Sequence, residues 1–325
     1  MEPCIVFFTI FLFTRNLSAE EQKKDHSMFD CNGIVENQTQ CLQALDRLSN
    51  DALWKEFLPL QVHLFFDQEF ALFSTKSWWE KAQRILEIGS GKGHFLHRLY
   101  AKAPEKEFLG IDIHRESVCA ARENFSTNHL RFAEKDGEHF FESLENGFDL
   151  IVLRMTLQHM KNPEVVLENA YRYLRPEGRL LIIDSYDPMR ECSYKTPYLD
   201  EAIAKLHCKN KEIGKGNRHI SFALQKSLMD EELSPYYEIE STNLTYDGER
   251  EDSSDDLMIR SEQSGRDYLL YNLLFFQLLK KVWKIEIDFE AAYEEASYFS
   301  QNVDSWMRSG KHYLILKKAS RHPPS

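Results

Sequence analysis

Short apolar runs alternate with segments of helical periodicity over residues 83–187, and this alternation constrains the fold more than any other feature. The runs that predict strands cover residues 84–89, 107–114, 130–137, 148–155 and 179–187. Segments 94–103, 116–125 and 163–178 have the apolar spacing of helices. Strands that alternate with helices at this spacing favour right-handed crossovers and a parallel sheet covered on both faces. The sequence therefore predicts a doubly wound, mostly parallel α/β sheet.

The segments outside this core differ from it in composition. Residues 1–50 combine an apolar leader with a polar approach segment, and residues 51–82 are dense in aromatic side chains. We expect the aromatic segment to form a helical cap that packs on the core, with a lid over a ligand as the alternative. Residues 188–306 predict a largely helical insertion that contacts substrate. Residues 307–325 predict a final strand and tail, with 310–318 as an edge strand.

Three glycines lie within five positions directly after the first predicted strand, in the stretch "ILEIGSGKG". Glycine at a strand-to-helix turn lets the backbone approach a ligand, and the start of the helix attracts the polar part of a nucleotide. Gly89, Gly91 and Gly93 are the residues concerned. A dinucleotide site of the G-x-G-x-x-G type would place a third glycine where His94 stands. We therefore expect a nucleotide-like cofactor, with NAD as the weaker candidate.

Two carboxylates follow the next two predicted strands. Asp112 ends the strand in "FLGIDIH" and is placed to accept hydrogen bonds from two ribose hydroxyls. Asp136 follows the third strand in "KDGEHF", where a carboxylate can face an adenine amino group. An acid at either position alone is also typical of a helix N-cap or a solvated loop. Their common order and spacing after the glycines favours a cofactor site.

The motifs "ILEIGSGKG", "FLGIDIH", "KDGEHF", "FDLIVLRMTLQHM" and "AYRYLRPEGRLLIIDSY" together resemble the class I S-adenosylmethionine-dependent methyltransferases, over about residues 80–187. The resemblance implies a Rossmann-like sheet and S-adenosyl-L-methionine as the cofactor. It assigns the methionine part of that cofactor to Glu87 and the three glycines, the ribose to Asp112, and the adenine to Asp136 and Gly137. Ile113 and Arg154 complete the expected cofactor contacts, and residues 154–159 are expected to line the methyl-transfer pocket.

The stretch after the fourth predicted strand restricts the acceptor. Methylases of base or glutamine amines usually carry an N/D-P-P-Y/F tetrad there, whereas this chain reads Leu153-Arg154-Met155-Thr156. We therefore expect a small or medium-sized acceptor, with a protein acceptor as the next candidate. An NAD-dependent oxidoreductase and a non-catalytic protein with the methyltransferase fold are the alternatives from other classes. No cluster of Cys and His in the sequence has the spacing of a metal site.

Methyl transfer depends mainly on holding donor and acceptor together, so a general base is needed only when the acceptor must lose a proton. His159 and Tyr186 are the candidates for a catalytic role, although a histidine in "LQHMKNPE" is also typical of a packed residue. Trp78, Arg190 and His219 are the candidates for substrate contacts.

The formal net charge of the chain is -12, and most of the excess lies between Asp230 and Glu262, where twelve acids stand against Arg250 and Arg260. A chain without a basic stripe is disfavoured as a nucleic-acid binder. Residues 4–14 are apolar, but no Lys or Arg precedes them, so we expect a cytoplasmic protein, with export or membrane association through this segment as the alternative. The apolar helix predicted over 268–283 is too short to span a bilayer and indicates a core helix or a homodimer contact.

Overall fold

The computed structural model describes residues 38–214, 216–229, 236–242, 258–302, 304–308 and 310–319. The chain divides into two compact units, each assembled from three separate segments. The larger unit takes in the described parts of Phe65–Lys195, Ile203–Ile259 and Trp306–Ser325. The smaller unit takes in the described parts of Met1–Leu64, Thr196–Ala202 and Arg260–Ser305.

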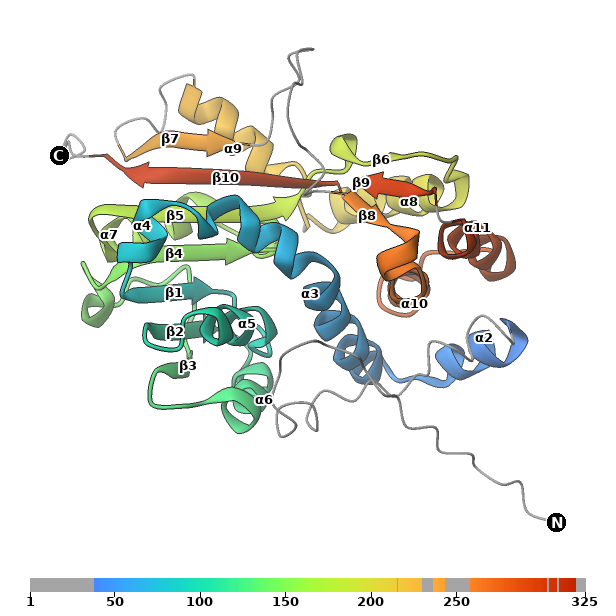
Figure 1. Cartoon of the computed structure of the whole chain (residues 1–325), viewed down its shortest axis with the longest axis horizontal. Helices are drawn as coiled ribbons and strands as arrows, with labels where there is room; N and C mark the ends of the chain where they lie inside the picture. The colour runs from blue at the N-terminus through green and yellow to red at the C-terminus, as the bar shows by residue number, and fades with distance from the viewer. Residues whose placement is uncertain are drawn as a thin grey trace. The chain divides into compact units, whose positions relative to one another are not determined.

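A seven-stranded sheet forms the larger unit, in the strand order β3-β2-β1-β4-β5-β10-β7 (Figure 1). Its strands are β1 (Arg84–Ile88), β2 (Glu107–Asp112), β3 (Leu130–Glu134), β4 (Phe148–Arg154), β5 (Leu174–Ser185), β7 (Tyr237–Thr242) and β10 (Lys311–Lys318). The first five strands pair in parallel, and β10 runs antiparallel to β5 and β7. All residues of β4 from Leu150 to Arg154 are buried, as expected for a strand covered on both faces. The predicted doubly wound α/β fold is confirmed.

Helices and short turns connect these strands. They are α4 (Ser77–Lys81), α5 (His94–Lys102), α6 (Arg115–Phe125), α7 (Pro163–Tyr173) and α9 (Ile220–Met229), with the 3₁₀ turns η2 (Glu142–Leu144), η3 (Leu157–His159) and η4 (Asp187–Met189). The larger unit also contains the parts of α3 (Asn50–Ser74) from Phe65 and of α8 (Pro197–Ile213) from Ile203. A small second sheet has the order β6-β9-β8, built from Glu191–Cys192, Trp306–Arg308 and Met258–Arg260.

The helix predicted over 163–178 is shorter than the sequence indicates. It starts at Pro163, where proline is favourable because the first helical N–H has no partner in the helix. It ends at Tyr173, and Leu174 already pairs with Phe148 of β4. The register between β4 and β5 then shifts, and Glu177 adopts a positive φ of 66° within the bulge. Pairing with β4 therefore takes the chain out of the helix before Pro176 and Gly178 are reached.

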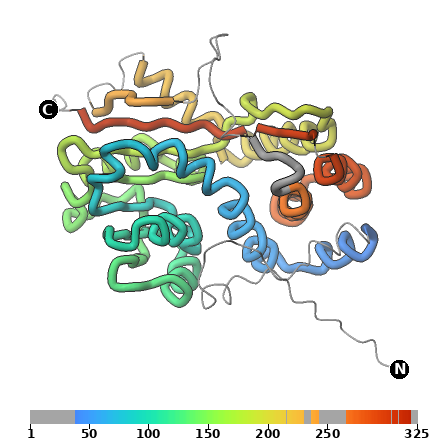
Figure 2. The backbone as a smooth tube through the Cα atoms, in the orientation of Figure 1, coloured from blue at the N-terminus to red at the C-terminus, as the bar shows by residue number. Residues whose placement is uncertain are grey.

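The predicted edge position of the last strand is wrong. β10 lies between β5 and β7, and Figure 2 shows the red C-terminal segment between yellow-green β5 and orange β7. Its first six residues are all buried, which suits an inner strand. The edge is formed by β7, which comes from residues 188–306, so this region contributes a sheet strand as well as helices.

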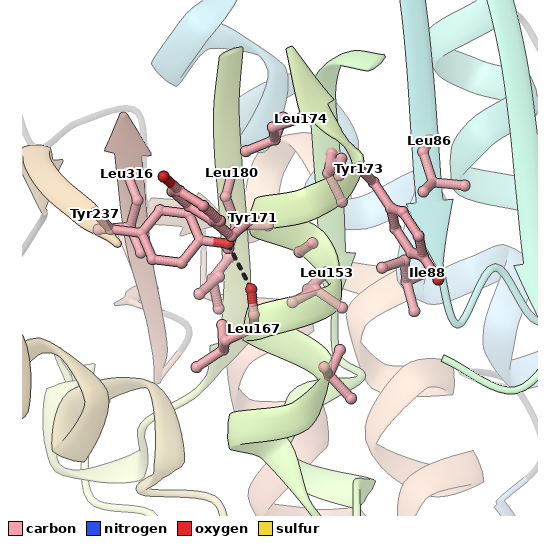
Figure 3. Close-up of a cluster of buried hydrophobic side chains, with 14 of the residues drawn as sticks. Leu86, Ile88, Leu153, Leu167, Tyr171, Tyr173, Leu174, Leu180, Tyr237 and Leu316 are labelled. Atoms are coloured by element: carbon pink, nitrogen blue, oxygen red, sulfur yellow. Dashed lines mark hydrogen bonds between the residues drawn. The ribbon is translucent and has the colours of Figure 1, made fainter. Parts of the chain in front are cut away.

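A cluster of buried apolar side chains packs α7 against the sheet (Figure 3). Leu86, Leu153, Leu180 and Leu316 come from four different strands, and each is fully buried. Tyr237 of β7 is also buried, and its hydroxyl donates to the carbonyl of Leu167 in α7 at 2.7 Å. Because its one polar atom is satisfied, this large ring can fill the core without an unpaired hydroxyl.

The smaller unit is helical. It contains α2 (Gln38–Arg47), α3 up to Leu64, α10 (Ser261–Lys281) and α11 (Phe289–Gln301). Five leucines of α10 lie in its core, namely Leu269, Leu270, Leu273, Leu274 and Leu278. The apolar helix predicted over 268–283 is thus a core helix of its own chain, which removes the observation that favoured a homodimer there.

None of the helices in the described part of the chain is long and apolar enough to cross a bilayer. The apolar segment 4–14 lies outside the described residues.

Candidate functional site

The turn between β1 and α5 contains the three glycines, and all three have positive φ: 76° at Gly89, 52° at Gly91 and 85° at Gly93. A Cβ at Gly89 would overlap the side chain of Thr156, and a Cβ at Gly93 would lie 2.7 Å from the ring of Phe132. These two glycines make room for the protein's own side chains, and the expected contact of all three with a cofactor stays a prediction. At Gly91 a Cβ would meet no described atom within 4 Å. Gly91 is the position in this turn that faces open space.

Asp112 ends β2 beside this turn. Its Oδ2 accepts from the N–H of Gly91 at 2.8 Å, and its Oδ1 accepts from the N–H of His114 at 2.8 Å. These bonds fix the carboxylate, and each oxygen retains a second lone pair for another donor. The next residue, Ile113, is 57% exposed, which is unusual for a large apolar side chain at the end of an inner strand.

Asp136 lies next along the same edge of the sheet. The N–H of Lys135 donates to the carbonyl of Asp112 at 3.0 Å, and Asp136 Oδ1 accepts from the N–H of Glu138 at 2.9 Å. Gly137 packs tightly, because a Cβ there would lie 2.7 Å from Ile88 Cγ2. The structure thus brings the ends of β1, β2 and β3, with their predicted site residues, to one edge.

Glu87 is the most unusual residue of β1. It is 2% exposed, and its Oε2 has no hydrogen-bond partner among the described residues. Burial raises the pKa of Glu87 to about 8 despite the attraction of Arg154, and the nearby charges of Asp112 and Glu69 raise it further. A buried carboxyl group with one unused oxygen, within the electrostatic reach of Asp112, which binds the N–H of Gly91, is suited to receive a cationic group.

Arg154 at the end of β4 belongs to a buried ion cluster that the sequence did not predict. Its Nε lies 2.7 Å from Glu69 Oε2 on α3, and Lys311 Nζ at the start of β10 lies 2.5 Å from Glu69 Oε1. All three side chains are almost completely buried. Burial lowers the pKa of Lys311 to about 7, against the opposing charge of Glu69. Arg154, which the sequence predicts as a cofactor contact, is therefore ion-paired with Glu69 in this structure.

A second cluster follows the end of β5. Both oxygens of Asp187 engage Arg218, at 2.5 Å to Nη2 and 2.6 Å to Nε, and its Oδ2 lies 2.8 Å from His207 Nε2. The ring of His219 stacks on that of His207 with centroids 5.0 Å apart, and it meets Tyr186 edge-on at 5.4 Å. Two predicted residues, Tyr186 and His219, are therefore neighbours, whereas His207 was missed. Its position inside a helix gave no motif by which to find it.

Of the remaining predicted residues, Arg190 lies beside the second cluster, because its N–H donates to the carbonyl of Asp187 at 2.9 Å. His159 is exposed in η3, and its N–H donates to the carbonyl of Thr156 at 2.9 Å. Arg190 Nη1 lies 3.5 Å from Cys192 Sγ. Trp78 donates from Nε1 to Glu240 Oε1 at 2.7 Å and stacks on Phe73, before the amino end of β1. Trp78 is thus separated from the glycine turn by the length of the strand.

Within the described residues, no group of three or more His, Cys, Asp or Glu side chains is arranged to hold a metal ion.

Comparisons with known proteins identify the family of the chain. A family model described as "Methyltransferase domain" matches residues 80–242. The ubiquinone/menaquinone biosynthesis C-methyltransferase UbiE of Dinoroseobacter shibae is 28% identical over 106 residues, which cover 32% of this chain and 42% of that protein. A tRNA (guanine-N(7)-)-methyltransferase of Pseudomonas putida is 32% identical over 123 residues, covering 34% and 51%. This chain therefore spans about half or less of the length of these relatives.

Among solved structures, the YcgJ protein of Bacillus subtilis has a TM-score of 0.45 and 18% identity, covering 80% of this chain and 100% of that one.

Proposed function

Because the chain belongs to the methyltransferase domain family, we propose that it is an S-adenosylmethionine-dependent methyltransferase. The bound cofactor would supply an activated methyl group on a sulfonium. The residues of this chain would bind that cofactor and hold an acceptor in line with the methyl group. Holding two reactants at near-attack distance can contribute roughly 7–11 kcal/mol to lowering a barrier.

The observation that carries this proposal is the unpartnered, buried oxygen of Glu87 on the strand that leads into the glycine turn, where Gly91 faces open space. S-adenosylmethionine has an ammonium group, ribose hydroxyls and an adenine ring. Glu87 would accept from the ammonium, and Asp112 would accept from the ribose through its remaining lone pairs. The exposed side chain of Ile113 would cover one face of the adenine, with Asp136 and Gly137 at its edge.

We infer that the acceptor is a small or medium-sized molecule. The names of the relatives point to different acceptors, among them a tRNA, so they do not select one. The net charge of -12 favours a small molecule over a nucleic acid, because phosphate binding requires clustered Lys and Arg. A protein acceptor is the second candidate.

Calorimetric titration tests the cofactor assignment. We expect S-adenosylmethionine and S-adenosylhomocysteine to bind and NAD not to bind. Asp112→Ala should abolish binding because it removes the ribose acceptor, whereas Glu123→Ala, an exposed acid on α6, should leave it unchanged. Binding of NAD alone would favour an oxidoreductase and overturn the proposal. Cofactor binding without transfer to any acceptor would favour a non-catalytic protein.

A further inference from the structure

We propose that His207, oriented by Asp187, is the general base that removes a proton from the methyl acceptor, and that the acceptor is a phenol. This inference rests on the proposed function and extends it to the acceptor. The sequence places Asp187 just past the fifth predicted strand but gives no motif at His207, and the two meet at the carboxyl end of β5.

The hydrogen bonds of Asp187 and His207 determine where the proton of the pair lies. Burial alone would raise the pKa of Asp187, but the hydrogen bonds from Arg218 and His207 outweigh burial and hold it well below its usual range. An ionised carboxylate can only accept, so Nε2 of His207 must carry the proton in the 2.8 Å bond. The other ring nitrogen, Nδ1, then holds a lone pair. A carboxylate that fixes the tautomer of a histidine is the arrangement that general-base catalysis uses.

Asp187 and His207 lie at the edge of the sheet where its parallel strands end. In an open α/β sheet, ligands bind outside the carboxyl ends of the strands where the strand order reverses, here between β1 and β4. Asp187 lies two residues after the end of β5, the neighbour of β4. The N–H of Asn217, next to Arg218, donates to the carbonyl of Gln158 in η3 at 2.9 Å. Thr156, just before η3, packs against Gly89, so continuous contacts join the pair to the glycine turn.

The side chain of His207 is accessible. It is 29% exposed, so a ligand can approach it. Tyr186 stacks on Phe222 with centroids 4.8 Å apart, and Phe222 is 37% exposed. With His219, these rings offer apolar faces beside the base. Aromatic rings pack well against one another, so an acceptor with a ring suits this surface.

The reaction balances with the groups named. The phenol oxygen forms a bond to the methyl carbon, and the carbon–sulfur bond breaks with its electron pair left on sulfur. The phenol proton passes to Nδ1 of His207 and then to solvent, while the Asp187 carboxylate balances the charge of the imidazolium. A carboxylate acceptor has no proton to lose and would gain nothing from this base.

His159 and His219 are the rival bases. Both are exposed on the same side of the sheet, but neither ring has a hydrogen bond to a carboxylate within the described part of the chain. The matched comparison is therefore His207→Gln against His159→Gln.

The first experiment needs no acceptor. Two-bond ¹H–¹⁵N NMR of the labelled full chain should find the neutral ring of His207 protonated at Nε2. In Asp187→Ala the carboxylate acceptor is lost, so the tautomer protonated at Nδ1 should become populated. A neutral ring protonated at Nδ1 in the unaltered chain, or a tautomer that Asp187→Ala leaves unchanged, overturns the proposal. If Asp187→Ala fails to fold, the tautomer in the unaltered chain decides.

The second experiment measures binding and transfer. The probes are methyl 4-hydroxybenzoate, which has a phenol, and benzoate, which has only a carboxylate. We expect transfer to the phenol alone, with a rate that falls about 10²–10⁴-fold in His207→Gln and loses its rise with pH. S-adenosylhomocysteine affinity should stay unchanged in His207→Gln.

Failure of the two proposals can be told apart. If the unaltered chain does not bind S-adenosylhomocysteine, the proposed function fails and this inference with it. If it binds but methylates only benzoate, or if His159→Gln loses the rate and His207→Gln keeps it, only the inference about His207 and the phenol is overturned.

Discussion

At the scale of single residues, the buried carboxyl group of Glu87 makes the stability of the folded chain depend on pH. The folded state raises its pKa from about 4.5 to about 8, so between these values the folded chain holds a proton that the unfolded chain has released. Stability from this proton is fully present below about pH 4.5 and is lost as the pH rises through about 8. A cationic ligand that ionises Glu87 would remove the same proton.

Glu87→Gln tests this directly, because glutamine imitates the neutral acid and does not titrate. We expect the free energy of unfolding of the unaltered chain, measured by urea at pH 5, 6.5 and 8, to fall with pH more steeply than that of the variant. One proton corresponds to a difference in slope of at most about 1.4 kcal/mol per pH unit. The comparison with the variant matters, since the pKa of Asp184 is also raised by burial, to about 7, and adds a slope of the same sign. Parallel curves for the two proteins would contradict the assignment.

At the scale of elements, the glycines at the junction of β1 and α5 differ in their surroundings. Gly89 and Gly93 pack against side chains, whereas Gly91 faces open space. In Gly93→Ala the new methyl group would lie 2.7 Å from the buried ring of Phe132, at a backbone φ of 85°. The left-handed strain and the overpacking together should lower the free energy of unfolding by about 2–5 kcal/mol.

Gly91→Ala is the matched variant, because it carries the backbone strain without the clash. We expect it to cost only about 1–2 kcal/mol of stability. Its methyl group would enter the space assigned to the cofactor, so its affinity for S-adenosylhomocysteine should fall at least about tenfold while the chain remains folded. Urea denaturation and calorimetry measure the two effects. Equal stability losses in the two variants would show that the ring of Phe132 does not set the requirement at Gly93.

The elements also show where sequence reasoning succeeds. The strands up to residue 187 were predicted because an apolar run and its flanking turn are local signals. The end of α7 was missed because it depends on Leu174 pairing with Phe148, which no local pattern reveals. The inner position of β10 depends on β7, a segment that the sequence assigned to an insertion.

The site divides in the same way. Gly91 and Asp112 belong to a contiguous motif and lie beside each other, joined by a hydrogen bond. Glu69 was missed because its partner Arg154 is 85 residues away in the chain and Lys311 is 242 residues away. His207 was missed because its bond to Asp187 joins a helix to the end of a strand. Side chains whose role depends on such distant partners cannot be found from one sequence.

At the scale of the whole molecule, the charge decides between classes of acceptor. The chain carries 40 Lys and Arg against 52 Asp and Glu, and twelve of the acids fall between Asp230 and Glu262. Nucleic-acid affinity depends on Lys and Arg that displace counterions from phosphates, and a strongly acidic surface repels the same phosphates.

We therefore expect unmodified tRNA to bind more weakly than about 10⁻⁴ M at 0.15 M salt, measured by fluorescence anisotropy with the labelled RNA. The same preparation should bind S-adenosylhomocysteine in calorimetry, which shows that the protein is folded and competent. Lowering the salt to 0.05 M should add little affinity, because the 52 Asp and Glu outnumber the 40 Lys and Arg that could release counterions. Micromolar or tighter binding that weakens steeply with salt would instead reveal a local basic surface that the total charge conceals. Such a surface would favour an RNA acceptor over the phenol assigned to His207, because a wide phosphate-binding face and the aromatic rings beside His207 suit different acceptors.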